Sequence, residues 1–245
     1  MAKRFNNKVV VVTGGTSGIG LAAAKAFVAE GAAVFITGRR QDVLDAAVRE
    51  IGGRVTGVRA DMSRLADIDR VYDAVQQRHA QIDVVVANAG GGTMLPLGAI
   101  TEEQYQQTFD TNVKGTIFTV QKALPLLKEG SSIILTGSTT GVMGTPQFSI
   151  YSATKAAVRN LARSWALDLR GSGIRVNVLS PGPTLTELAQ EVVGRDAMLD
   201  LGAGTPIGRV GQPDDIAAVA AFLASSDSSF MTGSEVFADG GLAQI

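Results

Sequence analysis

Residues 9–20 read Val9-Val10-Val11-Val12-Thr13-Gly14-Gly15-Thr16-Ser17-Gly18-Ile19-Gly20, in which four consecutive valines lead into a glycine-rich turn and a helical pattern. The valines are continuous rather than alternating, which is typical of a parallel strand buried on both faces. Glycines after such a strand permit a tight turn and let backbone N–H groups approach a phosphate at the helix N-terminus. The stretch predicts a dinucleotide site; the alternative is a glycine-rich turn without a ligand.

The same alternation of β-branched runs and helical patterns continues along the chain. Strands are predicted at 8–13, 33–37, 54–59, 82–87, 132–136, 174–179 and 234–237, and helices near 19–30, 41–51, 64–78, 101–128, 150–170 and 213–224. Thr101-Glu102-Glu103-Gln104 has the pattern of a capping box, and Pro213 suits a first helical turn. Strand–helix alternation with right-handed crossovers predicts an α/β fold: a doubly wound, Rossmann-type parallel sheet of about seven strands.

The chain shows no linker, repeat or low-complexity tract, so residues 1–245 are expected to form a single domain. The longest irregular stretch, 181–212, is rich in glycine, proline and threonine. Loops of that length are usually functional or disordered. We therefore expect a substrate loop at about 183–210.

The composition excludes several kinds of site and partner. The chain has no cysteine, which rules out disulfides and thiolate metal sites, and its net charge is −1. That balance gives no reason to expect nucleic acid or an acidic membrane as a partner. The one histidine, His79, leaves no Ser-His-Asp triad and no histidine-rich zinc site. The longest apolar run, 216–224, is about half of a membrane span, and a cytoplasmic protein is expected.

Basic residues follow the second predicted strand, which ends at Thr37-Gly38-Arg39-Arg40. NAD sites usually place an acid at this point for the ribose hydroxyls, whereas NADP sites place an arginine nearby for the 2′-phosphate. Here the first acid is Asp42, after both arginines. The pattern predicts NADP(H) in preference to NAD(H); the alternative is a solvated basic helix start.

A tyrosine and a lysine lie four residues apart in Tyr151-Ser152-Ala153-Thr154-Lys155, within a predicted helix. Residues four apart stack on one helix face, so the Lys155 ammonium should lie close to the Tyr151 hydroxyl. A positive charge beside the phenol would lower its pKa from about 10. The pair is therefore a candidate general acid/base.

Six motifs occur together in the order typical of one family. They are Thr13-Gly14-x-x-x-Gly18-x-Gly20; Asp61 after the third strand; Asn88-Ala89-Gly90 after the fourth, with Ala87 in place of the family's first asparagine; Asn112 and Ser138; Tyr151 with Lys155; and Pro181-Gly182 followed by Thr184. Over essentially its whole length the chain resembles a short-chain dehydrogenase/reductase of the compact single-domain branch.

The resemblance implies a role for each motif. Asn112, Ser138, Tyr151 and Lys155 correspond to the catalytic tetrad: Ser138 holds a carbonyl, Tyr151 transfers the proton, Lys155 also binds the nicotinamide ribose, and the Asn112 side chain holds a relay water. Asp61 faces the adenine, and Pro181-Gly182 with Thr184 holds the nicotinamide carboxamide. The full expected cofactor set is Gly14, Thr16, Ser17, Gly18, Ile19, Gly20, Arg39, Arg40, Asp61, Met62, Asn88, Ala89, Gly90, Tyr151, Lys155, Pro181, Gly182 and Thr184.

The residues expected to border the substrate are apolar: Met94, Leu95, Met143, Leu185, Leu188 and Met198. An uncharged ketone or secondary alcohol fits such a rim better than a small carboxylate. The prediction is an NADP(H)-dependent carbonyl reductase or alcohol dehydrogenase. The alternatives are a 3-oxoacyl-(acyl-carrier-protein) reductase, a sugar dehydrogenase and, from another class, a non-catalytic dinucleotide sensor. The resemblance further implies a homotetramer, and makes Gln244 a candidate magnesium ligand.

Overall fold

The computed structural model describes residues 3–244, and it confirms the predicted α/β sheet. Seven strands pair in the order β3-β2-β1-β4-β5-β6-β7, and each pairing is parallel. Their bounds are β1 Val9–Val12, β2 Ala33–Gly38, β3 Val55–Arg59, β4 Ile82–Ala87, β5 Leu127–Thr136, β6 Arg175–Pro181 and β7 Glu235–Ala238. All four residues of β1 are buried, as the continuous valines predicted.

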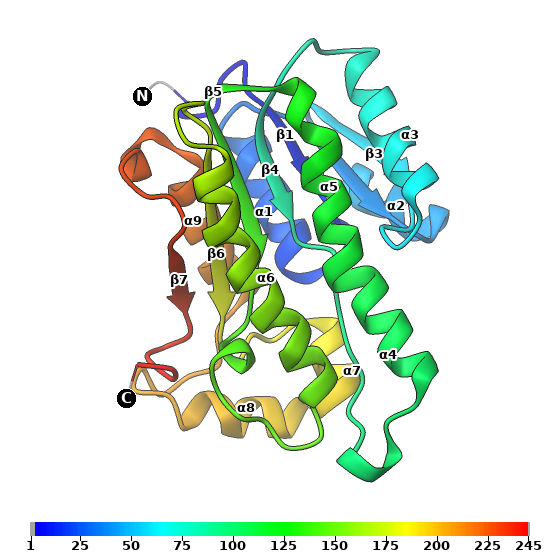
Figure 1. The fold of residues 1–245 in the computed structure, drawn as a ribbon, viewed down its shortest axis with the longest axis vertical. Coiled ribbons are helices and arrows are strands. Elements are labelled where there is room, and N and C mark those ends of the chain that lie inside the picture. Colours follow the sequence, from blue (N-terminus) through cyan, green and yellow to red (C-terminus); the bar gives the residue numbers. More distant parts are fainter. Residues whose placement is uncertain (1–2, 245) are drawn as a thin grey trace.

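Helices cover both faces of the sheet (Figure 1). Their bounds are α1 Gly18–Ala29, α2 Gln41–Ile51, α3 Leu65–Gln76, α4 Glu102–Phe109, α5 Gly115–Ala123, α6 Ser149–Asp168, α7 Glu187–Val193, α8 Arg195–Ala203 and α9 Pro213–Ala224. One apolar core joins α1, α2 and α9 to one face, and two others join α3, α5 and α6 to the opposite face. Burial on both faces explains why the central strands lack a polar alternation.

The helix predicted at 101–128 is interrupted. A π-helical turn, Asp110–Lys114, separates α4 from α5, and Pro125 lies in a short 3-10 turn before β5 begins at Leu127. Thr101 caps α4 as predicted, because its Oγ1 accepts from the Gln104 backbone N–H at 3.1 Å. The reciprocal half of the capping box is not formed: the Gln104 Nε2 donates to Thr93, and within residues 3–244 the Gln104 Oε1 accepts no hydrogen bond.

The stretch 181–212 is more regular than the sequence predicted. It contains α7 and α8, which meet at Gly194. Its two ends are tied together: the Leu185 N–H donates to the Gly211 carbonyl, and the Gly211 N–H donates to the Pro183 carbonyl, each at 2.8 Å. These two hydrogen bonds close the base of the segment, and its two helices form a cap beyond the carboxyl ends of the strands (Figure 1).

Among residues 3–244, no helix has both the length and the apolar character that crossing a bilayer requires.

Candidate active site

The glycine-rich turn after β1 is held against the end of β2. The Gly14 N–H donates to the Thr37 hydroxyl at 3.1 Å, and the Gly15 N–H donates to the Thr37 carbonyl at 3.0 Å. The turn is also tight, because a Cβ at Gly20 would lie 2.2 Å from the Gly14 carbonyl oxygen. Only glycine fits there, which gives the last residue of the motif a steric reason.

Asn88, at the end of β4, clamps the same turn. Its Nδ2 donates to the carbonyl oxygens of Thr13 and Gly14, at 3.1 and 3.3 Å. In return, the Thr13 hydroxyl accepts the backbone N–H groups of Asn88 and Ala89, both at 3.0 Å. The clamp is complete although Ala87 replaces the asparagine that family members carry before it.

The residues of this turn fit a pyrophosphate. Within the described chain, Ser17 precedes α1 without a side-chain hydrogen bond to the first turn, and that turn holds no acidic residue. The first N–H groups of a helix have no partner inside the helix and attract anions. The backbone of Gly18, Ile19 and Gly20 would therefore hold a dinucleotide's phosphates here.

Thr186, which the sequence analysis did not select, lies against the glycine-rich turn. It caps α7 by accepting from the Ala189 N–H at 3.1 Å, and its methyl carbon would lie 3.0 Å from a Cβ at Gly18. Thr184, which the sequence analysis selected, is 5 % exposed, and its hydroxyl donates a hydrogen bond to the Gly182 carbonyl. The detectable signal for Thr186 was its position as an N-cap before Glu187.

The residues expected around the adenosine lie at the carboxyl ends of β2 and β3. Arg39 and Arg40 are exposed. The Asp61 carboxylate accepts from the backbone and hydroxyl of Ser63, at 3.0 and 2.7 Å. Met62 is 4 % exposed and packs in the core on the α3 side of the sheet, so its side chain is a core side chain.

Helix α6 carries Tyr151 and Lys155 one turn apart, as predicted. The Lys155 Nζ lies 5.4 Å from the centre of the Tyr151 ring and donates to the Thr136 carbonyl at the end of β5, at 2.8 Å. Lys155 is 4 % exposed. This buried bond fixes the ammonium beside the phenol.

The predicted lowering of the Tyr151 pKa is wrong for this structure. Tyr151 as a residue is half-buried, but the protein surrounds its hydroxyl, and this burial raises the pKa of Tyr151 to about 12 despite the opposing effect of Ser138. Burial also lowers the pKa of Lys155 to about 8. Desolvation is the largest cause of both shifts. At neutral pH the phenol therefore carries its proton.

Ser138 follows β5 and has a hydrogen left to donate. Its Oγ accepts from the Thr140 backbone N–H at 3.2 Å and from the Thr140 hydroxyl at 3.0 Å. A serine hydroxyl accepts about two bonds and donates one. With both acceptor positions filled by Thr140, the Ser138 hydrogen is left to donate to the neighbouring Tyr151 hydroxyl or to a substrate oxygen between them.

Asn112 braces the site from the π-helical turn. It is 1 % exposed; its Oδ1 accepts from the Gly91 N–H at 3.0 Å, and its Nδ2 donates to the Gly91 carbonyl and the Thr154 hydroxyl, each at 2.9 Å. Thr154 in turn donates to the Tyr151 carbonyl at 2.6 Å. The amide therefore joins the loop after β4 to α6; its role in holding a relay water stays a prediction.

Gly92 and Phe148 enclose the Tyr151 ring. A Cβ at Gly92 would lie 2.8 Å from the Cβ and Cδ2 of Tyr151. The Phe148 ring stacks on the Tyr151 ring at 4.4 Å between centres, with 20° between the planes. The sequence did not indicate either contact, because both depend on how the loops fold over α6.

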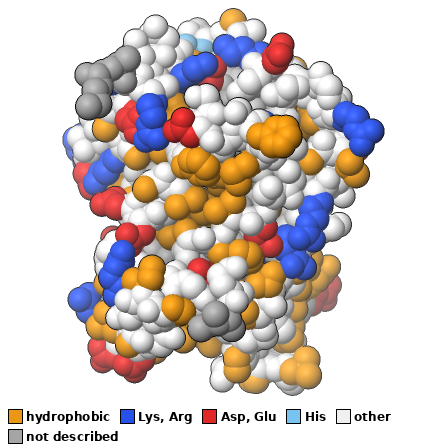
Figure 2. Space-filling view, turned by 90° about the vertical axis from the view of Figure 1, so that its left-hand side faces the viewer, with side chains coloured by type: hydrophobic (Ala, Val, Ile, Leu, Met, Phe, Trp, Pro, Cys, Tyr) orange, Lys and Arg blue, Asp and Glu red, His pale blue; other side chains and the backbone are white. Residues whose placement is uncertain are grey.

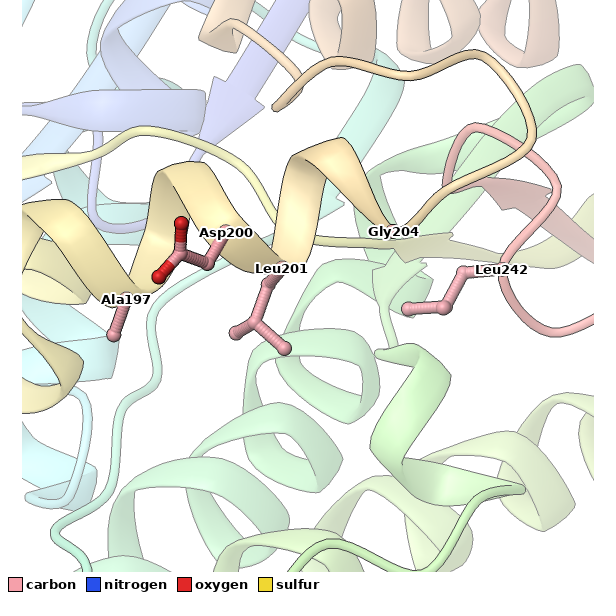
Figure 3. A pocket seen from close by; sticks show the side chains of 5 residues that line it. All are labelled: Ala197, Asp200, Leu201, Gly204 and Leu242. Carbon is pink, nitrogen blue, oxygen red and sulfur yellow. The ribbon is translucent and has the colours of Figure 1, made fainter.

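The apolar rim is only partly as predicted. Leu188 is 46 % exposed and packs near Gly91, whereas Met198 is 4 % exposed and points into the protein. A hollow of about 490 Å³ lies beside α8, lined by Ala197, Asp200, Leu201, Gly204 and Leu242 (Figure 3). Its lining is apolar apart from Asp200.

Gln244 is exposed near the end of the chain. Across residues 3–244, histidine and acidic side chains form no group of three that could hold a metal ion. The magnesium suggestion for Gln244 stays a prediction.

Comparisons with known proteins agree with this geometry. A family model described as enoyl-(acyl carrier protein) reductase matches residues 14–243. The oxidoreductase asL5 of Sarocladium schorii is 56 % identical over 99 % of this chain and 98 % of its own length. An NADP-dependent (R)-specific alcohol dehydrogenase of Lentilactobacillus kefiri is 38 % identical over 98 % of both chains.

A solved structure, that of levodione reductase, has a TM-score of 0.94 at 30 % identity and covers 98 % of this chain and 99 % of its own. Sequence motifs, sheet order, site geometry and relatives thus agree. The chain is an oxidoreductase that belongs to the short-chain dehydrogenase/reductase family, whose members use a nicotinamide dinucleotide.

Proposed function

We propose that this enzyme transfers a hydride between NADP(H) and an uncharged ketone or secondary alcohol, with Tyr151 as general acid/base. The observation that carries the proposal is the grouping of a protonated phenol, a fixed ammonium and a serine hydroxyl within reach of the phenol at the carboxyl edge of the sheet. Ligands of open α/β sheets bind at this edge.

Ser138, Tyr151 and Lys155 have separate roles in the proposed reduction. NADPH supplies the hydride when it is bound. The Ser138 hydroxyl donates to the substrate oxygen, and Tyr151 gives its proton to that oxygen as negative charge develops there. The Lys155 ammonium stabilises the phenolate that remains. In alcohol oxidation the proton returns to Tyr151.

Arg39 supports NADP(H) as the cofactor. It is exposed directly after β2, next to Gly38, where the acid of an NAD site would stand. A guanidinium binds phosphate by two hydrogen bonds, and the 2′-phosphate distinguishes the two cofactors. The 38 % identical relative from Lentilactobacillus kefiri, an NADP-dependent alcohol dehydrogenase, agrees with this choice.

The apolar rim supports an uncharged substrate. Leu188 and Val142 are exposed by 46 % and 42 %, and the other residues of the expected rim are apolar as well. A small carboxylate would need a fixed positive partner, which an apolar rim does not supply. A 3-oxoacyl thioester and a sugar remain the alternative substrates, and turnover on a panel of the three classes discriminates among them.

The decisive variant is Tyr151→Phe, with Tyr105→Phe as its matched control on the exposed surface of α4. We expect ketone reduction to fall about 10²–10⁴-fold in Tyr151→Phe, with unchanged NADPH affinity, because only the proton donor is lost. Activity close to wild type would overturn the acid/base role. NADPH binding by the wild type without turnover of any ketone would indicate a dinucleotide sensor.

We also propose a homotetramer. A groove of about 150 Å³ between α5 and α6 is lined by apolar side chains that include Ile117, Leu124 and Trp165. A second face carries the edge strand β7, and hydrophobic side chains gather in its middle (Figure 2). Sedimentation at micromolar concentration tests this; a monomer would refute it. The cytoplasmic location stays a prediction.

A further inference from the structure

We infer that Arg59, at the end of β3, is a second determinant of cofactor choice and binds the 2′-phosphate together with Arg39. The inference rests on the proposed NADP(H) dependence. The sequence analysis did not select Arg59, because it follows Val58 in a strand pattern and lies twenty residues beyond Arg39.

The register of the sheet places Arg59 on the side of the glycine-rich turn. Gly38 and Arg59 are partners in the parallel pairing of β2 with β3. Partners in register present their side chains on the same face. A Cβ at Gly38 would point at Thr16 and lie 2.4 Å from its methyl carbon. The Arg59 side chain therefore leaves the sheet on the face that carries the turn.

A hydrogen bond then sets the direction of the guanidinium. The Arg59 Nε donates to the Arg39 carbonyl oxygen at 3.1 Å. This bond uses one donor and leaves the two terminal nitrogens of Arg59 available. The planar Arg59 guanidinium, held beside Arg39, can donate to several acceptor oxygens of a phosphate.

The electrostatics of the free protein also point to an anion. Arg39, Arg40 and Arg59 are all exposed. Among the ion pairs formed by residues 3–244, none involves these three arginines. Neighbouring like charges without a counter-charge repel one another, and a phosphate with nearly two negative charges relieves that repulsion.

The test variant is Arg59→Gln. Glutamine places an amide nitrogen as many bonds from Cα as the arginine Nε, so the bond to the Arg39 carbonyl can persist while the charge is lost. Arg54→Gln is the matched control, since Arg54 is exposed before the first residue of the same strand, at the end away from Arg39. Arg39→Ala is the positive control, and thermal melting verifies that each variant is folded.

The measurement is calorimetric binding of two probes, 2′,5′-ADP and 5′-AMP, which differ by the 2′-phosphate. We expect Arg59→Gln to weaken 2′,5′-ADP binding about three- to fivefold and to leave 5′-AMP binding within about twofold, as for an exposed ion pair. Arg54→Gln should change neither. The effect should shrink in high salt.

Two results separate this inference from the proposed function. If the wild type prefers 2′,5′-ADP and Arg39→Ala loses that preference while Arg59→Gln keeps it, the role of Arg59 is wrong and the NADP(H) proposal stands. If the wild type binds both probes equally, both are wrong. Equal weakening of both probes by Arg59→Gln would mean that the residue only supports the backbone.

Discussion

Placing an aspartate at Gly38 should convert the enzyme to NADH only when Thr16 is made smaller. An acid at the end of β2 would accept hydrogen bonds from the ribose of NADH and repel the 2′-phosphate of NADPH. The backbone of Gly38 is outside the left-handed region, so it accommodates an aspartate. The obstacle is steric and comes from the glycine-rich turn.

The structure gives the size of that obstacle. A Cβ at Gly38 would lie 2.4 Å from the Thr16 Cγ2, but 3.3 and 3.5 Å from the Thr16 Oγ1 and Cβ. Thr16→Ser removes the one atom that clashes. Overpacking typically costs about 1–3 kcal/mol, and because the clash displaces the cofactor turn, we expect about a five- to 150-fold loss of affinity for both cofactors in Gly38→Asp alone.

The assay is kcat/KM for NADPH and NADH on four proteins: wild type, Thr16→Ser, Gly38→Asp and the double variant. We expect Gly38→Asp to lose efficiency with both cofactors and the double variant to recover efficiency with NADH only. The two changes should therefore be strongly non-additive, as expected for groups in contact. A Gly38→Asp variant that uses NADH as well as the double variant does would refute the reasoning.

Three further predictions concern the catalytic groups and the cap. Gly92→Ala should lower kcat at least about tenfold with NADPH affinity within about twofold, because its Cβ would displace the Tyr151 ring; unchanged kcat would contradict this. Lys155→Met should stabilise the protein while inactivating it, because burial lowers the pKa of Lys155 from 10.5 in the unfolded chain to about 8 in the folded one. Below pH 8, removing the charge should raise the free energy of unfolding by about 3 kcal/mol, less the contribution of the lost hydrogen bond to Thr136. This gain should fade as the pH rises towards 10.5. Denaturant melts at pH 7 and pH 10 measure that difference, and equal gains would refute it. Residues 185–205 should exchange amide hydrogens faster without cofactor and substrate than in the ternary complex; equal, strong protection would exclude a mobile cap.

The sequence by itself determined the features that depend on residues close together in the chain. Four consecutive valines predicted a buried parallel strand, and the glycines after them predicted a phosphate-binding turn. The spacing of Tyr151 and Lys155 predicted their shared helix face. Local periodicity and turn chemistry act over a few residues, so they can be interpreted before any fold is known.

The tertiary structure alone decided the features that depend on residues far apart. The pKa of Tyr151 rises because distant segments surround its hydroxyl, and this burial outweighs the hydrogen bond with Ser138. Likewise, the register of β2 with β3 brings Arg59 beside Arg39, and the fold of the turn brings Thr16 against Gly38. Burial and cross-strand neighbours arise from packing between elements, and no local pattern encodes them.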